Sequence, residues 1–139
     1  MSDNIIRAEN APVPMGHYPH ARRVGDLLFL SGVGPRDPES NIIDGNSYNH
    51  QGEVISYDIE KQCHAVFANV KTILEASGAR WDQLVDVTVF LTDMYNDFPT
   101  YNRIYKEYFQ ENPPCRTTVG ITSLPSAIAI ELKCIAYLG

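Results

Sequence analysis

Two charged side chains in the last quarter of the chain could do carboxylate and water chemistry. Arg116 stands directly after a Pro-Pro break, where its guanidinium could grip a carboxylate with two parallel hydrogen bonds. The alternative is an ordinary surface ion pair, because most arginines are solvated. Glu131 interrupts an apolar stretch, so it is either a structural partner for Arg116 or Lys133, or a base or acceptor that orients water. The residue types alone leave these alternatives open.

Other polar side chains give weaker signals. His17 and His20 make a poor metal site without a third ligand nearby, so loop packing is favoured for both. Cys115 lies next to Arg116 and could be an activated thiolate, but the pattern indicates no companion histidine. The glycines of residues 31–34 lack the lysine and the following helix of a phosphate-binding loop. We therefore expect neither a metal nor another cofactor.

The composition limits the class of protein. With 139 residues, 44% of them apolar, the chain is long enough for one domain, which we assign to residues 1–139. A net charge of −6 offers no basic surface for nucleic acid, and no apolar run is long enough to span a membrane. The three cysteines form no CxxC pair and suit reduced thiols. Because the N-terminus lacks a signal-peptide pattern, we expect a soluble cytoplasmic protein.

The first half of the chain predicts a hairpin between two irregular segments. Residues 1–16 contain prolines and few periodic apolar positions, which indicates an irregular arm. Residues 22–24 and 27–33 flank a Gly-Asp turn and predict antiparallel strands. Residues 34–52 are rich in Pro, Asp, Asn, Ser and Gly and predict a loop. Loops of this length are often functional, so it is a candidate wall or lid of a site.

The second half predicts two helices and three strands. Apolar spacing of three and four residues predicts helices over 57–77 and 97–110, the first ended by a glycine and the second by prolines. Alternation and β-branched residues predict strands over 85–91, 115–122 and 128–138.

The order of these elements indicates an α+β domain in which two helices cover one face of a sheet. In residues 128–138 the apolar side chains fall on one face, and Glu131 and Lys133 fall on the other. The second face carries both apolar and polar side chains, and no remaining element can cover it. We therefore expect that face to be buried against other copies of the same chain.

Segments spread over nearly the whole chain resemble the RidA/YjgF family of enamine and imine deaminases. The matching segments are GHYPHA at 16–21, LSG at 30–32, NVKTILEASG at 69–78, VTVFLTD at 87–93, PCRTTV at 114–119 and IEL at 130–132. The last two segments, which contain Arg116 and Glu131, are the most specific because the spacing between them also matches the family.

The resemblance implies a chorismate-mutase-like fold, a homotrimer, and active clefts between neighbouring subunits. It implies that Arg116 binds the substrate carboxylate and that Glu131 positions or activates water. Tyr18, Ser31 and Asn102 fall at positions that line or support the cleft. The expected reaction is therefore hydrolysis of an enamine or imine carboxylate, with ammonia as a product and without a cofactor.

The chain departs from the common family pattern in three places. After Ser31 and Gly32 it has VGPR where many members have Gln and an apolar residue. Thr118 stands where a cysteine is common, and it is retained as a candidate substrate-binding residue. Residues 36–52 are enlarged. These departures resemble the 2-aminomuconate deaminases, a branch that acts in the degradation of aromatic compounds.

A dicarboxylate such as 2-aminomuconate needs a second cationic anchor in a protein of negative net charge. Arg36 could supply that anchor, and His17 and His20 could hydrogen-bond the same end of the substrate. The alternative for Arg36 is a loop arginine paired with Asp37 or Glu39.

Other functions remain open at this point. They are a general 2-imino acid deaminase, a non-catalytic ligand-binding or chaperone-like trimer, a thiol hydrolase that uses Cys115, and an isomerase of chorismate-mutase type. Ammonia release from a fresh enamine separates the deaminases from the others.

Overall fold

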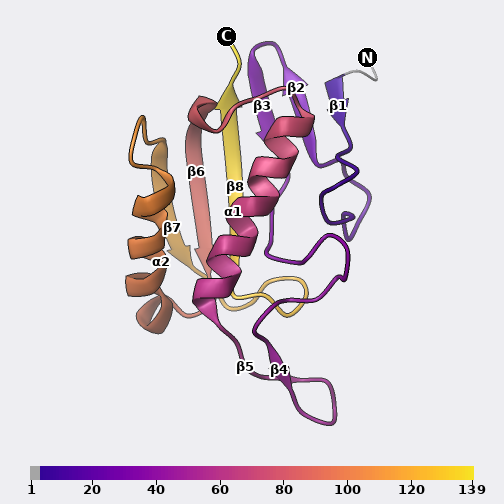
Figure 1. Cartoon of the computed structure of the whole chain (residues 1–139), viewed down its shortest axis with the longest axis vertical. Helices are drawn as coiled ribbons and strands as arrows, with labels where there is room; N and C mark the ends of the chain where they lie inside the picture. The colour runs from indigo at the N-terminus through magenta and orange to yellow at the C-terminus, as the bar shows by residue number, and fades with distance from the viewer. Residues whose placement is uncertain (1–3) are drawn as a thin grey trace.

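A six-stranded mixed sheet forms one layer of the molecule, and two helices form the other (Figure 1). The computed structural model describes residues 4–139. Across the sheet the strands follow the order β1 (Ile5–Ile6), β2 (Ala21–Val24), β3 (Leu27–Leu30), β8 (Ile130–Tyr137), β6 (Leu84–Leu91) and β7 (Cys115–Gly120). Strands β6 and β7 are parallel, and the other neighbouring pairs are antiparallel. Strand β6 therefore separates the strand of Arg116 from the strand of Glu131.

Strands β2 and β3 form the predicted hairpin. Its turn contains Gly25, whose φ of 60° lies in the left-handed region that glycine enters without a Cβ clash. The pairing continues just past β3, where the backbone N–H of Ser31 donates to the carbonyl oxygen of His20 at 3.0 Å. The hairpin thus brings the end of β3 beside the end of the N-terminal arm.

Both helices begin at an aspartate cap. The carboxylate of Asp58 accepts a hydrogen bond from the backbone of Lys61 at 3.1 Å at the start of α1 (Ile59–Ala76). Asp93 accepts one from the backbone of Asn96 at 3.1 Å at the start of α2 (Met94–Tyr108). Such caps satisfy backbone donors that the first turn leaves open. The two helices pack side by side on one face of the sheet (Figure 1).

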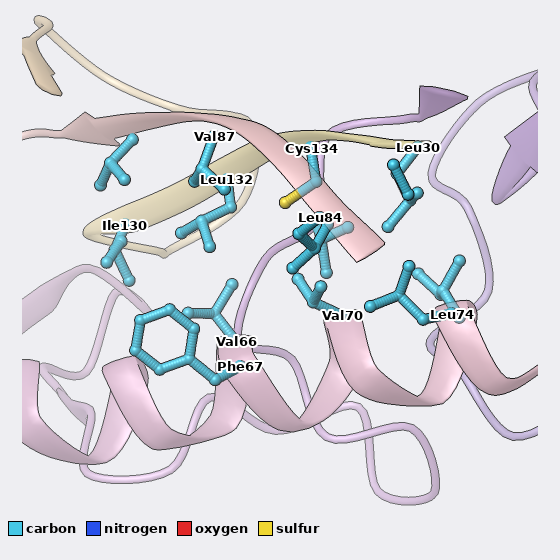
Figure 2. Close-up of a cluster of buried hydrophobic side chains, with 14 of the residues drawn as sticks. Leu30, Val66, Phe67, Val70, Leu74, Leu84, Val87, Ile130, Leu132 and Cys134 are labelled. Atoms are coloured by element: carbon cyan, nitrogen blue, oxygen red, sulfur yellow. The ribbon is translucent and has the colours of Figure 1, made fainter. Parts of the chain in front are cut away.

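The hydrophobic core lies between the helices and the sheet. Figure 2 shows α1 directing its apolar side chains at those of β3, β6 and β8; the labelled residues are Leu30, Val66, Phe67, Val70, Leu74, Leu84, Val87, Ile130, Leu132 and Cys134. Along β8, alternate residues from Ile130 to Ala136 are fully buried against the helices. The residues between them, Glu131, Lys133 and Ile135, point to the face that has no helices.

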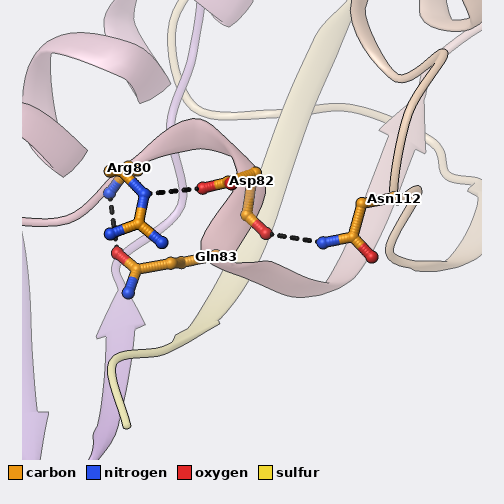
Figure 3. Close-up of polar contacts among 4 residues, drawn as sticks. All are labelled: Arg80, Asp82, Gln83 and Asn112. Carbon is orange, nitrogen blue, oxygen red and sulfur yellow. Dashed lines mark hydrogen bonds and ion pairs between the residues drawn. The ribbon is translucent and has the colours of Figure 1, made fainter.

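A polar cluster ties the connection after α1 to the connection before β7 (Figure 3). Arg80 forms an ion pair with Asp82, with Nε 3.0 Å from Oδ1, and its backbone N–H donates to Gln83 Oε1 at 2.8 Å. Asn112 Nδ2 donates to the carbonyl oxygen of Asp82 at 3.0 Å. The cluster therefore fixes the segment that leads into β7, the strand of Arg116.

The structure confirms the predicted hairpin, the two helices on one face, and the three later strands. It adds four short elements that the sequence does not predict. The strand β1 lies in the arm expected to be irregular, and β4 (Ser47–Tyr48) lies in the segment expected to be a plain loop, where it pairs with β5 (Val54–Ser56). The fourth is a 3₁₀ turn at Trp81–Gln83. Each has at most three residues, too few for a period to appear in the sequence.

The three cysteines are free thiols, as expected. Cys63 and Cys134 are buried, and burial raises the pKa of each to about 12, so both remain protonated near neutral pH. Cys115 is exposed on β7. Within residues 4–139 no helix is both long enough and apolar enough to cross a membrane.

Candidate functional site

A pocket is shared by the N-terminal arm, the end of β3 and the start of β8. Its wall contains Tyr18, Ser31, Arg36 and Glu131, four of the residues that the sequence predicts for the site. Most of the remaining wall is apolar and comes from the arm at residues 12–15 and from the loop before β8. An apolar pocket with a few polar groups is typical of small-molecule sites.

The carboxylate of Glu131 lies in this pocket and has no hydrogen-bond or ion-pair partner in the described chain. A Cβ on Gly32 would lie 2.7 Å from Glu131 Oε2, so the carboxylate packs directly over this glycine. Within residues 4–139 the Glu131 side chain makes no hydrogen bond or ion pair, and the ammonium of Lys133 instead donates to the carbonyl oxygen of Leu30. Burial raises the pKa of Glu131 above its ordinary value. The described chain therefore gives no support to a structural pairing with Arg116 or Lys133.

Ser31 and Tyr18 add hydroxyl groups to the same wall. Ser31 Oγ donates to the carbonyl oxygen of Pro19 at 2.7 Å, which leaves its lone pairs as acceptors. The Tyr18 hydroxyl accepts a hydrogen bond from the backbone of Met15 at 3.2 Å and keeps its own proton to donate. Ser31 could therefore accept a hydrogen bond from a ligand, and Tyr18 could donate one.

The two histidines do not act together. His20 is buried, its Nδ1 lies 2.9 Å from the donating N–H of Ala8, and its Nε2 lies 2.7 Å from the carbonyl oxygen of Pro12. The ring is therefore the neutral Nε2–H tautomer and is fully used in holding the arm, which is the loop-packing role. His17 is exposed and does not line the pocket. Residues 4–139 contain no cluster of side chains that could hold a metal ion.

Arg116 belongs to a second cluster, at the edge formed by β7 and α2. Its Nη1 donates to Asn102 Oδ1 at 2.9 Å, and its guanidinium carbon lies 4.7 Å from the ring centroid of Tyr105 and 5.3 Å from that of Tyr101. The hydroxyl oxygens of Thr118 and Tyr101 are 3.0 Å apart, within hydrogen-bond distance. Within the described residues Arg116 has no carboxylate partner, although it is exposed. The cluster thus offers an oriented cation.

The two clusters lie on opposite faces of the sheet. Arg116 is the register partner of Val87, whose side chain is buried under the helices. Glu131 is the register partner of Phe90, on the face without helices. Paired residues of neighbouring strands share a face, so Arg116 and Glu131 of one chain cannot meet in one pocket. Their predicted convergence therefore requires a neighbouring copy to bring its β7 edge to this pocket.

Comparison with known proteins identifies the family. The family model described as endoribonuclease L-PSP matches residues 8–138. A RutC family protein of Pyrococcus abyssi is 40% identical over 99% of this chain and 98% of its own length. This chain belongs to the RidA/YjgF family.

One relative in the RidA/YjgF family is named for the reaction it catalyses, and the structure of another holds a bound amino acid. The 2-iminobutanoate/2-iminopropanoate deaminase of Dermatophagoides farinae is 34% identical, with 96% of this chain and 95% of that protein covered. The crystal structure of Escherichia coli TdcF with bound serine is 31% identical and superposes with a TM-score of 0.82 over 97% of this chain and 98% of that chain. The RidA/YjgF fold expected from the sequence is thereby confirmed.

Several RidA/YjgF site features were not found from the sequence. Tyr101 and Tyr105 are assigned by their spacing to the helix core, and they are indeed buried, yet their rings also face Arg116. Gly32 belongs to the matching LSG segment, but its role of leaving room for Glu131 could not be seen in the sequence. Such roles depend on contacts between distant segments. The one feature of the sequence that could have indicated the contact with Arg116 is the four-residue spacing of two tyrosines, which places both rings on one side of the predicted helix.

Proposed function

We propose that this chain is a deaminase of enamine and imine carboxylates, with active sites formed between neighbouring subunits of a homotrimer. One observation carries the proposal: an oriented arginine and a partly buried glutamate each lack an opposite charge within the described chain, and they lie on opposite faces of the sheet. A second copy that joins its β7 edge to the pocket gives both groups a common ligand. The relative named as a 2-iminobutanoate/2-iminopropanoate deaminase supports the same reaction class.

In this proposal Arg116 of one subunit holds the substrate carboxylate. One Nη1 donor is used by Asn102, and the guanidinium keeps further donors for a two-point contact. The tyrosine rings behind it restrict the guanidinium to one plane. The carboxylate is thereby fixed next to the reacting carbon, and such positioning can lower a barrier by several kcal/mol.

Glu131 of the neighbouring subunit then handles the proton of water. An enamine first tautomerises to the imine. The Glu131 carboxylate accepts a proton as the water oxygen forms a bond to the imine carbon and the C=N electron pair moves to nitrogen, which takes up a proton. The resulting carbinolamine expels ammonia as its hydroxyl becomes a carbonyl group. Tyr18 and Ser31 could orient the water and the nitrogen from the pocket wall.

For the specific substrate we propose 2-aminomuconate, which would give 2-oxo-3-hexenedioate and ammonia in the cytoplasmic degradation of aromatic compounds. The departures at 33–36 and 36–52 support this choice, and so does the position of Arg36 in the pocket wall. The general 2-imino acid deaminase is the alternative. Ammonia release from freshly generated 2-aminomuconate and 2-iminobutanoate, measured side by side, separates the two.

The test of the reaction class is the substitution Arg116→Ala. We expect this variant to keep its fold and oligomeric state and to lose ammonia release by at least about a hundredfold, since misplacement of a substrate alone has an effect of that size. Arg103→Ala, which removes an exposed arginine paired with Glu60 at 3.0 Å, is the matched control. Normal turnover in Arg116→Ala would leave a ligand-binding trimer, or a different site, as the better account.

A further inference from the structure

Arg36 is held rigidly at the pocket wall from two sides. Asn69 of α1 is buried, and its side-chain amide donates to the carbonyl oxygens of Gly34 at 2.9 Å and of Arg36 at 2.8 Å. The Arg36 guanidinium donates from Nη1 to Asn41 Oδ1 at 2.8 Å and from Nη2 to the carbonyl oxygen of Val13. Backbone and side chain are therefore both fixed before any ligand arrives.

The positive charge of Arg36 is not neutralised by the described chain. Both of its partners, an amide oxygen and a carbonyl oxygen, are uncharged. Asp37, the nearest acid in sequence, instead accepts hydrogen bonds from the backbone of Glu39 at 2.9 Å and of Ser40 at 2.8 Å, which lower its pKa. No ion pair of Arg36 exists within residues 4–139, so neither Asp37 nor Glu39 takes the role that the sequence left open for them.

The guanidinium keeps donors for a ligand. Of its five N–H groups, the contacts to Val13 and Asn41 use one on each terminal nitrogen. The others remain for a carboxylate. Among the described pocket residues Arg36 is the one permanent cation, because His20 is neutral, and Glu131 is the one acid. A ligand that brought a second negative charge beside Glu131 would be repelled unless that charge met Arg36.

We propose that Arg36 binds the second carboxylate of a linear dicarboxylate substrate, so that the substrate bridges two subunits. The proposal rests on the proposed function, in which Arg116 of the neighbouring copy holds the first carboxylate. The two anchors then belong to different chains. A dicarboxylate therefore links the chains and stabilises the oligomer, because it binds the assembled state and not the separated chains. A monocarboxylate contacts only Arg116, so it stabilises the oligomer less than a dicarboxylate does.

Two unreactive probes of equal length test this inference. Muconate and sorbate are both six-carbon dienes, and muconate has one carboxylate more. We expect the full-length protein to bind muconate at least about tenfold more tightly than sorbate in calorimetry, because one charge-assisted contact is added. Muconate is also expected to raise the temperature of oligomer dissociation more than sorbate does at equal occupancy.

The variant Arg36→Met removes the cation and keeps the length of the side chain. We expect it to bind the two probes equally, and its circular dichroism spectrum and oligomeric state should match those of the wild type, which shows that the fold and the assembly are intact. Arg36→Lys should restore part of the preference. Arg23→Met, at an exposed ion pair outside the pocket, should keep the whole preference. A preference for muconate that survives in Arg36→Met overturns the inference.

The same experiment separates this inference from the proposed function. In Arg116→Ala both probes should lose affinity, and ammonia release should be lost. If Arg116→Ala releases ammonia normally, the proposed function fails, and with it the bridging arrangement. If only the Arg36→Met result differs from expectation, the proposed deaminase function holds, and the proposal that Arg36 binds the second carboxylate fails.

Discussion

At the scale of single residues, Glu131 depends on the absence of a side chain at position 32. Its carboxylate packs over Gly32 in a space where a methyl group would come within 2.7 Å of Oε2. Neither Lys133 nor Arg116 of the same chain neutralises it. A carboxylate in such surroundings is a better proton acceptor than a solvated one, because burial raises its pKa.

The substitution Gly32→Ala tests this dependence. The added methyl group meets the flexible end of Glu131, so we expect the carboxylate to move while the backbone stays in place. Ammonia release should fall by about a hundredfold, and the free energy of unfolding should change by no more than about 1 kcal/mol. Gly120→Ala is the control, because its methyl group would meet Met94 at an ordinary 3.6 Å. Full activity in Gly32→Ala would contradict the proposed position of the base.

The raised pKa of Glu131 predicts a pH dependence. The carboxylate must be ionised to accept a proton, so kcat/KM should rise with pH through the pKa of Glu131, with a midpoint above the ordinary value for glutamate. The folded state favours the protonated form, so Glu131 lowers stability as pH rises through the same range. Glu131→Gln should abolish this rise in the residual activity. If the rise persists in that variant, another group is responsible for it.

At the scale of elements, α2 supports β7 by presenting one helical face to Arg116. Tyr101 and Tyr105 are four residues apart and so lie on the same side of the helix, and Asn102 adds the amide acceptor beside them. The polar cluster around Asp82 and Asn112 holds the segment that enters β7. The orientation of the guanidinium is therefore a property of the pair of elements.

Two substitutions of Tyr105 distinguish the role of its ring from the role of its hydroxyl group. The hydroxyl is buried without a hydrogen-bond partner in the described residues, so Tyr105→Phe should leave KM unchanged and raise the free energy of unfolding by up to about 1 kcal/mol. Tyr105→Leu removes the ring face, and KM for 2-iminobutanoate should rise several-fold, in line with about 0.5–2 kcal/mol for a cation–ring contact. Equal KM values in the two variants, measured by ammonia release, would rule out a positioning role.

The sequence predicts helices and strands well where the apolar period continues over many residues. It predicts them poorly where contacts between distant segments determine the structure. Periodic apolar residues define α1 and α2, and alternation defines β8 with Glu131 on the helix-free face. The strand β1 forms only because β2 is available to pair with it. The face that Arg116 occupies depends on the parallel register between β6 and β7, which no local pattern encodes. Residue types thus indicated the site, and its division between two faces required the structure.

At the scale of the whole molecule, the face without helices is the remaining surface to explain. Phe29 and Ile135 are register partners on that face, with Phe90 further along the sheet, and Leu27 and Tyr137 beside them are exposed. From the residues on this face we expect it to contact other copies of the chain. That contact would place subunits side by side, as the shared site requires.

The substitution Ile135→Lys tests this use of the face. A second ammonium beside Lys133 on a surface buried between copies should prevent assembly. We expect a folded monomer by light scattering and circular dichroism, without ammonia release, because Arg116 and Glu131 of a single chain lie on opposite faces of the sheet and cannot complete one site. Arg23→Lys, on the exposed β2 strand with its charge kept, should assemble normally. A fully active monomeric Ile135→Lys protein would show that one chain is sufficient.

The central claim is that Arg116 and Glu131 act from different subunits, and complementation tests it most directly. Arg116→Ala and Glu131→Gln chains are purified as inactive proteins, then unfolded and refolded together in equal amounts. A site is complete only where an intact Arg116 of one chain meets an intact Glu131 of the next, so random trimers should regain about a quarter of the wild-type ammonia release. A mixture as inactive as its two parents would contradict the account.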